Sequence, residues 1–210
     1  YEISACLVGS EMCIRDRIHS EMPAMSQGRL HGFQLWVNMP AKEKMSKPDY
    51  IYIDSKKMQI FEDKDKIVKI IAGKFENAEG PVIGHNVEPV YFDIELKEEK
   101  DFNYKLPATH NSFLYLIDGE IKIGEKTHDR VENSTLILLS KGEQLKVTSL
   151  TKAKFLLISL FRKTRCSPFF FCGGCSFYSC WSGPSYFFFL GVLFAEGAFA
   201  FFLLLLFPFR

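Results

Sequence analysis

The stretch His110–Ile123, which reads HNSFLYLIDGEIKI, decides the fold class of this chain. Two runs rich in β-forming residues, Ser112–Ile117 and Glu120–Ile123, flank the dipeptide Asp118-Gly119. Asp-Gly between two apolar runs is a strong hairpin signal, because the tight turn needs residues that tolerate a positive φ. The stretch therefore predicts two antiparallel strands joined by a short turn.

Further short strands are expected on both sides of this hairpin, with little helix. The expected strands are Gly32–Asn38, Ile67–Ala72, Val90–Leu96, Ser134–Leu139, Gln144–Leu150 and Lys154–Ser159. Two of them, Ile67–Ala72 and Val90–Leu96, alternate imperfectly between apolar and polar residues. Seven or eight short strands at close spacing predict an all-β sandwich or barrel of the jelly-roll type. The polar, Lys-rich segment Ala41–Pro48 predicts a connector between two units.

Two motifs near the start of the strand-rich segment resemble those of a known family. Ile18–Pro23 reads IHSEMP and His31–Pro40 reads HGFQLWVNMP, and Lys44-Met45 and Pro48 follow. The pattern resembles the pirins, which carry a similar H-x-E-M-P followed by an H-G-x-Q-L-W-V-N signature. His110–Ile123 in turn resembles the central hairpin of the second cupin domain of that family.

The resemblance runs from His19 to Leu160 and implies a fold and a domain organisation. Pirins consist of two cupin domains, each a jelly-roll β-barrel, so the chain is expected to hold an incomplete N-terminal cupin plus one C-terminal cupin. Residues 18–48 would be the remnant of the N-terminal cupin with its connector, and residues 49–160 the C-terminal cupin. The strands Ile18–Met22 and Gly32–Asn38 are then expected to lack their partners, or to attach to the second barrel.

The resemblance also implies an iron site. Pirins bind iron in the first cupin through three histidines and a glutamate, two from an H-x-H pair and two from a later H-x-E. On this chain the H-x-E is His19 and Glu21. Residues two apart on a strand point to the same face, and imidazole with carboxylate suits non-haem Fe(II). Without the resemblance, an H-x-E is more often a surface pair or a core histidine than a pair of ligands.

The upstream H-x-H that would complete this site does not occur in the printed sequence. We expect His31 to have a packing role in its strand, His85 and His128 to lie in loops, and His110 to precede the central strand of the second cupin. That cupin has no H-x-H, so we expect its interior to be filled by side chains and to hold no metal. Two ligands of four predict weak iron binding and an inactive chain.

The two ends of the chain look foreign to the segment between them. Leu7–Arg17, which reads LVGSEMCIRDR, resembles the translation of a DNA-sequencing adapter, so residues 1–17 are expected to be an artefact. The alternative is an ordinary N-terminal extension. Residues 161–210 form a Phe-rich tail, in which Glu196 and Arg210 are the only charged residues from Cys166 onward.

Three explanations of this tail are open, and misread sequence is the one we expect. Out-of-frame translation accounts together for the composition, the lack of charge and the abrupt start. A real membrane segment is the second, because Phe187–Phe207 is long enough to span a bilayer, although Glu196 would cost about 2 to 3 kcal/mol there. The third is a zinc site, for which the cysteines are irregularly spaced; they are Cys166, Cys172, Cys175 and Cys180.

Two functions are implied for an intact member of the family. Bacterial pirin-like proteins are associated with quercetin 2,3-dioxygenase-type activity, in which an Fe(II) site cleaves a flavonol with dioxygen. Eukaryotic pirins are iron-dependent nuclear cofactors of transcription regulators. The iron ligands do not separate these functions. We expect the dioxygenase type, with a flavonol-like small molecule as the ligand. The third possibility is that this chain is an isolated, metal-free cupin fragment.

The composition of the chain limits which partners and which cellular compartment are expected. The net charge of +1 gives no sign of a nucleic-acid contact. The segment between Arg15 and Arg165 has no cysteine and no basic-apolar leader precedes it, so we expect a cytoplasmic protein. A membrane partner is expected only if the run at residues 187–207 is real.

Overall fold

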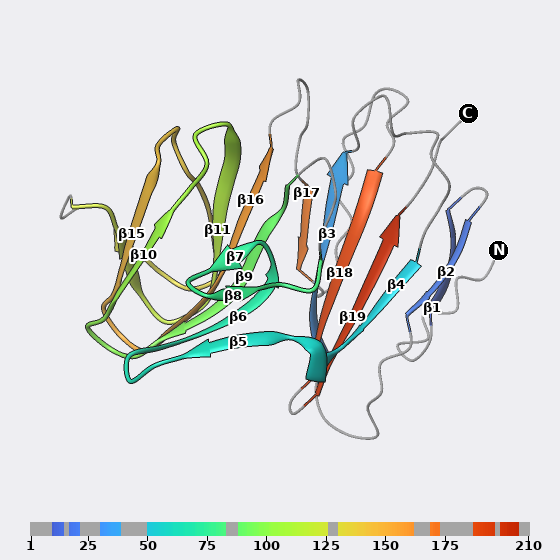
Figure 1. Cartoon of the computed structure of the whole chain (residues 1–210), viewed down its shortest axis with the longest axis horizontal. Coiled ribbons are helices and arrows are strands. Elements are labelled where there is room, and N and C mark those ends of the chain that lie inside the picture. The colour runs from blue at the N-terminus through green and yellow to red at the C-terminus, as the bar shows by residue number, and fades with distance from the viewer. Residues whose placement is uncertain are drawn as a thin grey trace. The chain divides into compact units, whose positions relative to one another are not determined.

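The computed structural model describes residues 10–14, 17–21, 30–38, 50–82, 88–125, 130–161, 169–172, 187–195 and 198–205. The chain divides into two compact units (Figure 1). One comprises Tyr1–Lys57 with Arg165–Arg210; the other, here called the core unit, is Met58–Thr164. Each unit is described by itself. The domain boundaries expected at 48/49 and 160/161 stay a prediction.

The core unit consists of antiparallel strands in two main sheets. The larger sheet has the order β14-β11-β16-β9-β6-β5. Its strands are β5 (Gln59–Glu62), β6 (Lys66–Ala72), β9 (Val90–Leu96), β11 (His110–Asp118), β14 (Thr135–Leu138) and β16 (Ala153–Phe161). The smaller sheet, β10-β15-β12-β13, contains β10 (Asp101–Lys105), β12 (Ile121–Ile123), β13 (Arg130–Val131) and β15 (Gln144–Ser149). A small hairpin pairs β7 (Lys74–Phe75) with β8 (Ala78–Glu79).

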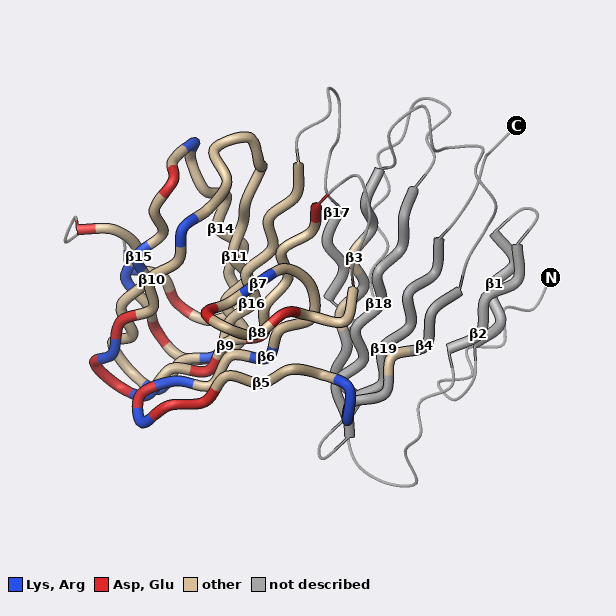
Figure 2. Tube along the Cα trace, in the orientation of Figure 1, with Lys and Arg blue, Asp and Glu red and all other residues tan. Residues whose placement is uncertain are grey.

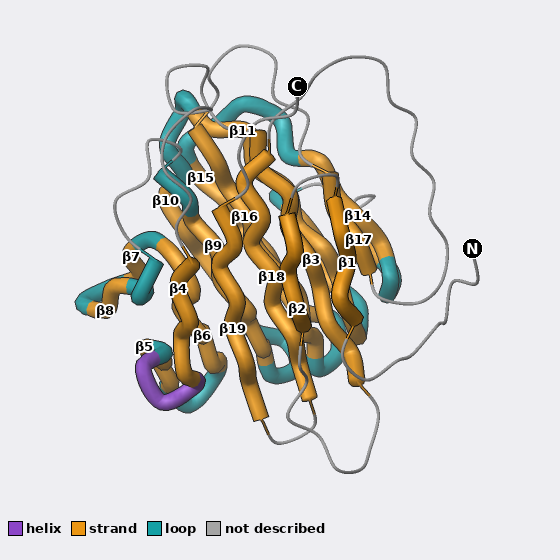
Figure 3. Tube along the Cα trace, turned by 90° about the vertical axis from the view of Figure 1, so that its right-hand side faces the viewer, coloured by secondary structure: helices purple, strands orange, loops and turns teal. Residues whose placement is uncertain are grey.

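The expected all-β class is confirmed. Within the described part of the chain the only helical element is the 3-10 turn η1 (Ser55–Lys57), purple in Figure 3, which belongs to the first unit. No helix among the described residues is long and apolar enough to cross a membrane.

The hydrophobic core lies between the two sheets of the core unit. Alternate residues of β9, from Val90 to Leu96, join a single cluster of buried side chains on what we call the inner face of the six-stranded sheet. The four-stranded sheet contributes Phe102 and Leu145 to the same cluster. The rings of Phe92 and Tyr104 meet edge to face at 5.1 Å. Large side chains thus fill the space between the sheets, as expected.

The hairpin predicted at Asp118-Gly119 is wrong, although the turn itself is present. β11 and β12 lie in different sheets: β11 pairs with β14 and β16, and β12 pairs with β13 and β15. Gly119 adopts a φ of 85°, as the turn requires. A register shift between Leu116 and Asp118 precedes it, and such a bulge bends a strand. The turn therefore carries the chain from one sheet to the other.

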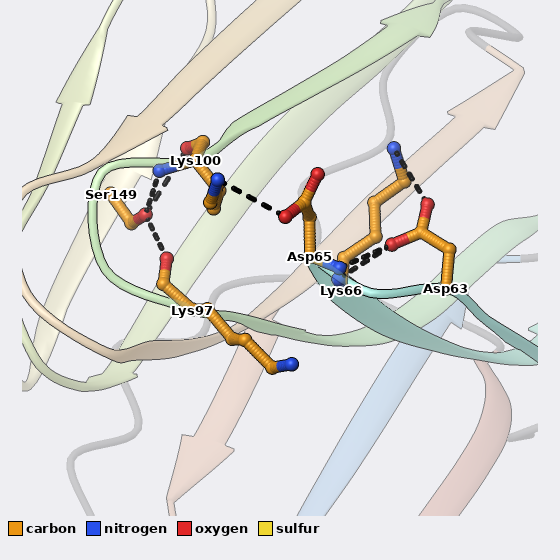
Figure 4. Close-up of polar contacts among 6 residues, drawn as sticks. All are labelled: Asp63, Asp65, Lys66, Lys97, Lys100 and Ser149. Atoms are coloured by element: carbon orange, nitrogen blue, oxygen red, sulfur yellow. Dashed lines mark hydrogen bonds and ion pairs between the residues drawn. The ribbon is translucent and has the colours of Figure 1, made fainter.

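One end of the core unit is held by polar contacts (Figure 4). Asp63 accepts hydrogen bonds from two backbone N–H groups of its own turn, at 2.7 and 2.8 Å. Lys100 Nζ lies 3.1 Å from Asp65 Oδ1. The fully buried Ser149 accepts a hydrogen bond from Lys100 N at 3.0 Å and donates one to the carbonyl of Lys97. These bonds join β15 to the turns before β6 and β10, where Figure 2 shows charges of both signs.

The described strands of the first unit form two sheets. β1 (Ser10–Ile14) pairs with β2 (Arg17–Glu21), and the second sheet has the order β17-β3-β18-β19-β4. The strands of that sheet are β17 (Phe169–Cys172), β3 (Leu30–Asn38), β18 (Phe187–Ala195), β19 (Ala198–Leu205) and β4 (Tyr50–Asp54).

The expectation that the strands at Ile18–Met22 and Gly32–Asn38 lack partners or join the second barrel is wrong. β2 pairs with β1, and β3 pairs on both sides with strands of the Phe-rich tail. The backbone of that tail satisfies hydrogen-bonding groups that β3 would otherwise leave open. The predicted connector Ala41–Pro48 lies outside the described residues.

Candidate functional site

Three polar side chains lie at the end of the inner face that is opposite to the Asp63 turn. His110, expected just before its strand, is the first residue of β11. Ser112 follows two residues later and stands directly opposite Ser159 of β16. Because alternate residues of a strand share a face, His110 and Ser112 continue the row of the buried Leu114 and Leu116. The apolar interior therefore ends in a polar cluster.

Hydrogen bonds order this cluster. His110 Nδ1 lies 3.1 Å from Ser159 Oγ, which lies 2.7 Å from Ser112 Oγ. Ser159 is fully buried, and the His110 side chain is 1% exposed. The other ring nitrogen, Nε2, has no hydrogen-bond partner among the residues that the structure describes. Glu88 Oε2 lies 3.9 Å from it, which is too far for a hydrogen bond.

Burial sets the protonation state of His110. It lowers the pKa of the imidazole below its ordinary value, and the nearby Glu88 carboxylate, which raises that pKa, offsets the effect only in part. The ring is therefore neutral at pH 7, with a proton on one nitrogen and a lone pair on the other. The ring of Phe161 stands edge-on to it, with centroids 6.0 Å apart.

Glu88, whose carboxylate lies near this imidazole, has a strained backbone conformation. Its φ of 43° lies in the left-handed region, and Pro89 follows it directly. A left-handed conformation costs a non-glycine residue about 1 to 2 kcal/mol, and the residue before a proline ordinarily prefers an extended conformation. The Glu88 side chain is 75% exposed, so its carboxylate remains in contact with water.

A second group of charges occupies the other face of the six-stranded sheet. Asp93 of β9 is 2% exposed, and its Oδ2 lies 3.5 Å from Lys69 Nζ and 3.7 Å from Lys154 Nζ. Glu95 Oε1 accepts a hydrogen bond from Lys154 Nζ at 3.1 Å. Burial raises the pKa of Asp93 above its ordinary value even though both lysines lower it. This network links β6, β9 and β16.

The Asp93 carboxyl predicts a pH dependence of stability. Because its pKa is raised in the folded state, its contribution to stability is full below its ordinary pKa and is lost as the pH rises through the folded value. Asp93→Asn is neutral at every pH. The free energy of unfolding of this variant, relative to the unaltered chain, should therefore rise as the pH increases from about 3 to 7. Urea unfolding followed by circular dichroism measures this difference.

Asp63→Asn is the matched control for this experiment. Burial opposes ionisation of Asp63 too, but the backbone N–H groups of Asp65 and Lys66 prevail and lower its pKa. A lowered pKa contributes stability above the ordinary value and loses it on acidification. The relative stability of Asp63→Asn should therefore fall as the pH rises. The same slope for both variants would contradict the assignment.

The predicted iron ligands His19 and Glu21 lie in β2. The structure describes the backbone of this strand and neither of these side chains, so the ligand pair stays a prediction. His31 lies in β3, and only the backbone of this residue is described. His85 and His128 lie outside the described residues.

The described residues do not gather three or more His, Cys, Asp or Glu side chains in an arrangement that could hold a metal ion. His110 and Glu88 lie close together but supply two such side chains, one fewer than that minimum. Sequence reasoning missed this pair because no spacing rule joins a residue before β9 to the first residue of β11. The alternation of His110 and Ser112 ahead of Leu114 could have indicated the polar end of the inner face.

The chain resembles known proteins along most of its length. The model of the pirin C-terminal cupin domain matches residues 91–159. A pirin-like protein of Caulobacter vibrioides is 35% identical over 144 residues, which are 68% of this chain and 51% of that protein. A Pseudomonas aeruginosa protein named "Putative quercetin 2,3-dioxygenase" is 31% identical over 147 residues, which are 68% of this chain and 52% of that protein. Human pirin is 28% identical over 134 residues, which are 63% of this chain and 46% of human pirin. The chain thus spans about half the length of the curated relatives that it matches.

Two solved structures share the fold. A quercetin 2,3-dioxygenase from Acinetobacter baumannii superposes with a TM-score of 0.55 at 22% identity, over 60% of this chain and 44% of that one. A protein of Geobacillus kaustophilus gives a TM-score of 0.54 at 18% identity, over 63% and 70% of the two chains. At these identities the likeness concerns the fold alone. Together with the domain match, it confirms the cupin fold predicted from the sequence.

Proposed function

The chain belongs to the pirin family, whose C-terminal cupin domain it carries at residues 91–159, and from this premise we propose its function. A full-length protein that contains this segment is an Fe(II)-binding bicupin with quercetin 2,3-dioxygenase-type activity. The present chain, with two of four expected ligands, is inactive. The observation that carries the proposal is the identity of 31% to a relative named for that activity.

The donor set of the predicted ligand pair fits the metal. His19 offers an imidazole nitrogen and Glu21 a carboxylate oxygen, and non-haem Fe(II) oxygenases bind their metal through this combination. Iron in such a site supplies the electron transfer that a flavonol and dioxygen need in order to react. The role of the two side chains is to hold the ion while leaving positions open.

The partner of this site is proposed to be a flavonol-like small molecule. The support for this ligand is the name of the relative that is 31% identical to this chain. We propose the cytoplasm as the compartment, on the basis of the cysteine-free segment between Arg15 and Arg165.

Fe(II) binding to the present chain tests the predicted ligands. We expect weak binding that is lost in His19→Ala and in Glu21→Gln, with a fall in affinity of at least about tenfold. Anaerobic equilibrium dialysis followed by metal analysis measures it. All variants are made in a His110→Ala background, so that the buried imidazole of the core unit does not contribute.

His128→Ala serves as the control for the loss of any one histidine. It should leave Fe(II) binding unchanged, because His128 has no expected role. Equal binding by His19→Ala and the control would show that His19 is not a ligand. One iron held through extensive dialysis would contradict the incomplete site.

A further inference from the structure

The imidazole of His110 has one nitrogen engaged and one available. Ser159 Oγ can accept the Nδ1 proton, because its own hydroxyl can then donate to Ser112 Oγ at 2.7 Å. In this tautomer Nε2 carries a lone pair. Metal-binding histidines commonly have this arrangement, in which the far ring nitrogen donates to a neighbouring acceptor and so fixes the tautomer and the ring orientation.

The burial of His110 Nε2 is energetically unfavourable. His110 Nε2 is buried and has no hydrogen-bond partner among the described residues. A buried polar atom without a partner destabilises the fold, because it has given up its hydrogen bonds to water and gained none in return. A ligand that binds Nε2 would recover that cost, whereas a hydrophobic residue at this position would never incur it.

The neighbouring carboxylate of Glu88 indicates which kind of ligand could bind Nε2. Glu88 Oε2 and His110 Nε2 are 3.9 Å apart. Typical Zn–N and Zn–O bonds add up to about 4.2 Å, so one ion between the two atoms can contact both. The pairing of a neutral imidazole with a carboxylate favours a divalent transition metal over an anion, which Glu88 would repel. Because the Glu88 side chain is 75% exposed, water can fill the remaining positions.

We propose that His110 and Glu88 form a binding site for one divalent transition-metal ion at the polar end of the inner face of the core unit. Ser159 is a positioning residue that orients the imidazole and does not touch the ion. The proposed site uses neither of the predicted iron ligands, His19 and Glu21. It departs from our expectation of no metal in the second cupin, which considered only the H-x-H and H-x-E spacings.

Zn²⁺ titration of the full chain tests this proposal. The titration is made in a His19→Ala/Glu21→Gln background and followed by calorimetry, so that the result does not depend on the proposed iron site. We expect one equivalent of Zn²⁺ to bind, and His110→Ala and Glu88→Gln each to lower the affinity at least about tenfold. Ser159→Ala should lower it by roughly tenfold, since it removes the partner of Nδ1 and leaves both ligands in place.

Two matched controls separate ligation from general effects. Glu76→Gln alters another exposed glutamate with a left-handed backbone, φ 51°, and should leave Zn²⁺ affinity unchanged. His128→Ala removes a histidine outside the proposed site and should also bind as before. Glu88→Gln changes an exposed side chain, so it keeps the test valid even if His110→Ala fails to fold.

The proposal is overturned if the background protein binds no Zn²⁺, or if Glu88→Gln binds it as tightly as Glu76→Gln does. Substitution with Co²⁺ provides a second readout. The visible absorption bands of bound Co²⁺ should appear in the background protein and be lost in Glu88→Gln, whereas bands of equal intensity in both proteins would exclude Glu88 as a ligand.

Discussion

Gly119→Ala should lower the free energy of unfolding of the core unit by roughly 3 to 5 kcal/mol. Two effects add at this position. The φ of 85° is unfavourable for any residue with a Cβ, at a cost of about 1 to 2 kcal/mol. In addition, a Cβ would lie 2.3 Å from the carbonyl oxygen of Lys152 and 2.8 Å from Ala153 Cα. Both are backbone atoms, one in the residue before β16 and one in its first residue, so relieving the clash requires movement of the strand.

Hydrogen exchange of the amides of β9 and β16 measures this loss. Both tryptophans, Trp36 and Trp181, lie outside the core unit, so their fluorescence does not report on it. Amides in central strands exchange through the largest openings and therefore report the global free energy.

Gly124→Ala is the matched control. Gly124 also has a positive φ, 71°, but a Cβ there would meet no atom within 4 Å. It should cost only the conformational part, about 1 to 2 kcal/mol. If the two variants lost the same free energy, the close approach of the turn to β16 would be refuted.

Phe92→Ala should lower the free energy of unfolding by about 3 to 5 kcal/mol. Phe92 is fully buried in the middle of β9. Its ring stands edge to face with Phe75, at 5.7 Å between centroids, and with Tyr104, at 5.1 Å. Because these residues come from both sides of the core, removing the ring leaves a cavity that neither sheet can close alone. Hydrogen exchange of the amides of β9 and β16 also measures this loss of free energy.

Ile60→Ala controls for the general loss of an apolar side chain. Ile60 lies on the edge strand β5 and is 52% exposed. Its removal should change the free energy of unfolding by about 0.5 kcal/mol or less. A comparable effect of both substitutions would mean that the aromatic cluster is not the centre of the core.

The strands that could be predicted from the sequence are those whose own residues determine them. Val90–Leu96 was expected over the residues that β9 occupies, because a dense run of β-forming residues between turns has few alternatives. Asp101–Lys105 was missed, since DFNYK has two charged ends and a polar centre, and only pairing with β15 makes it a strand. Strand propensity depends on such context.

The partner of a strand was harder to predict than its position. Asp118-Gly119 correctly indicates a turn, because a positive φ is a local property of the two residues. Which strands lie beside β11 depends on contacts that are distant in the sequence, and here β14 and β16 provide them along the length of β11. The predicted hairpin therefore failed at the level of pairing.

The same limit applies to the residues of the two proposed metal sites. His19 and Glu21 were found through a family motif, where two residues in one short segment carry the signal. His110, Glu88 and Ser159 come from separate strands or strand ends, and only the register of β11 with β16 and the path of the chain into β9 bring them together. A single sequence contains no spacing that reports such a group.

The most direct test of the central claim is quercetin-dependent dioxygen uptake by a full-length protein that contains this segment, loaded with Fe(II) and compared with its His19→Ala variant. Our account predicts uptake by the loaded protein and background uptake by the variant, with the present chain also at background. Undiminished uptake by His19→Ala would contradict the account, because dioxygenase chemistry would then not depend on the predicted ligand.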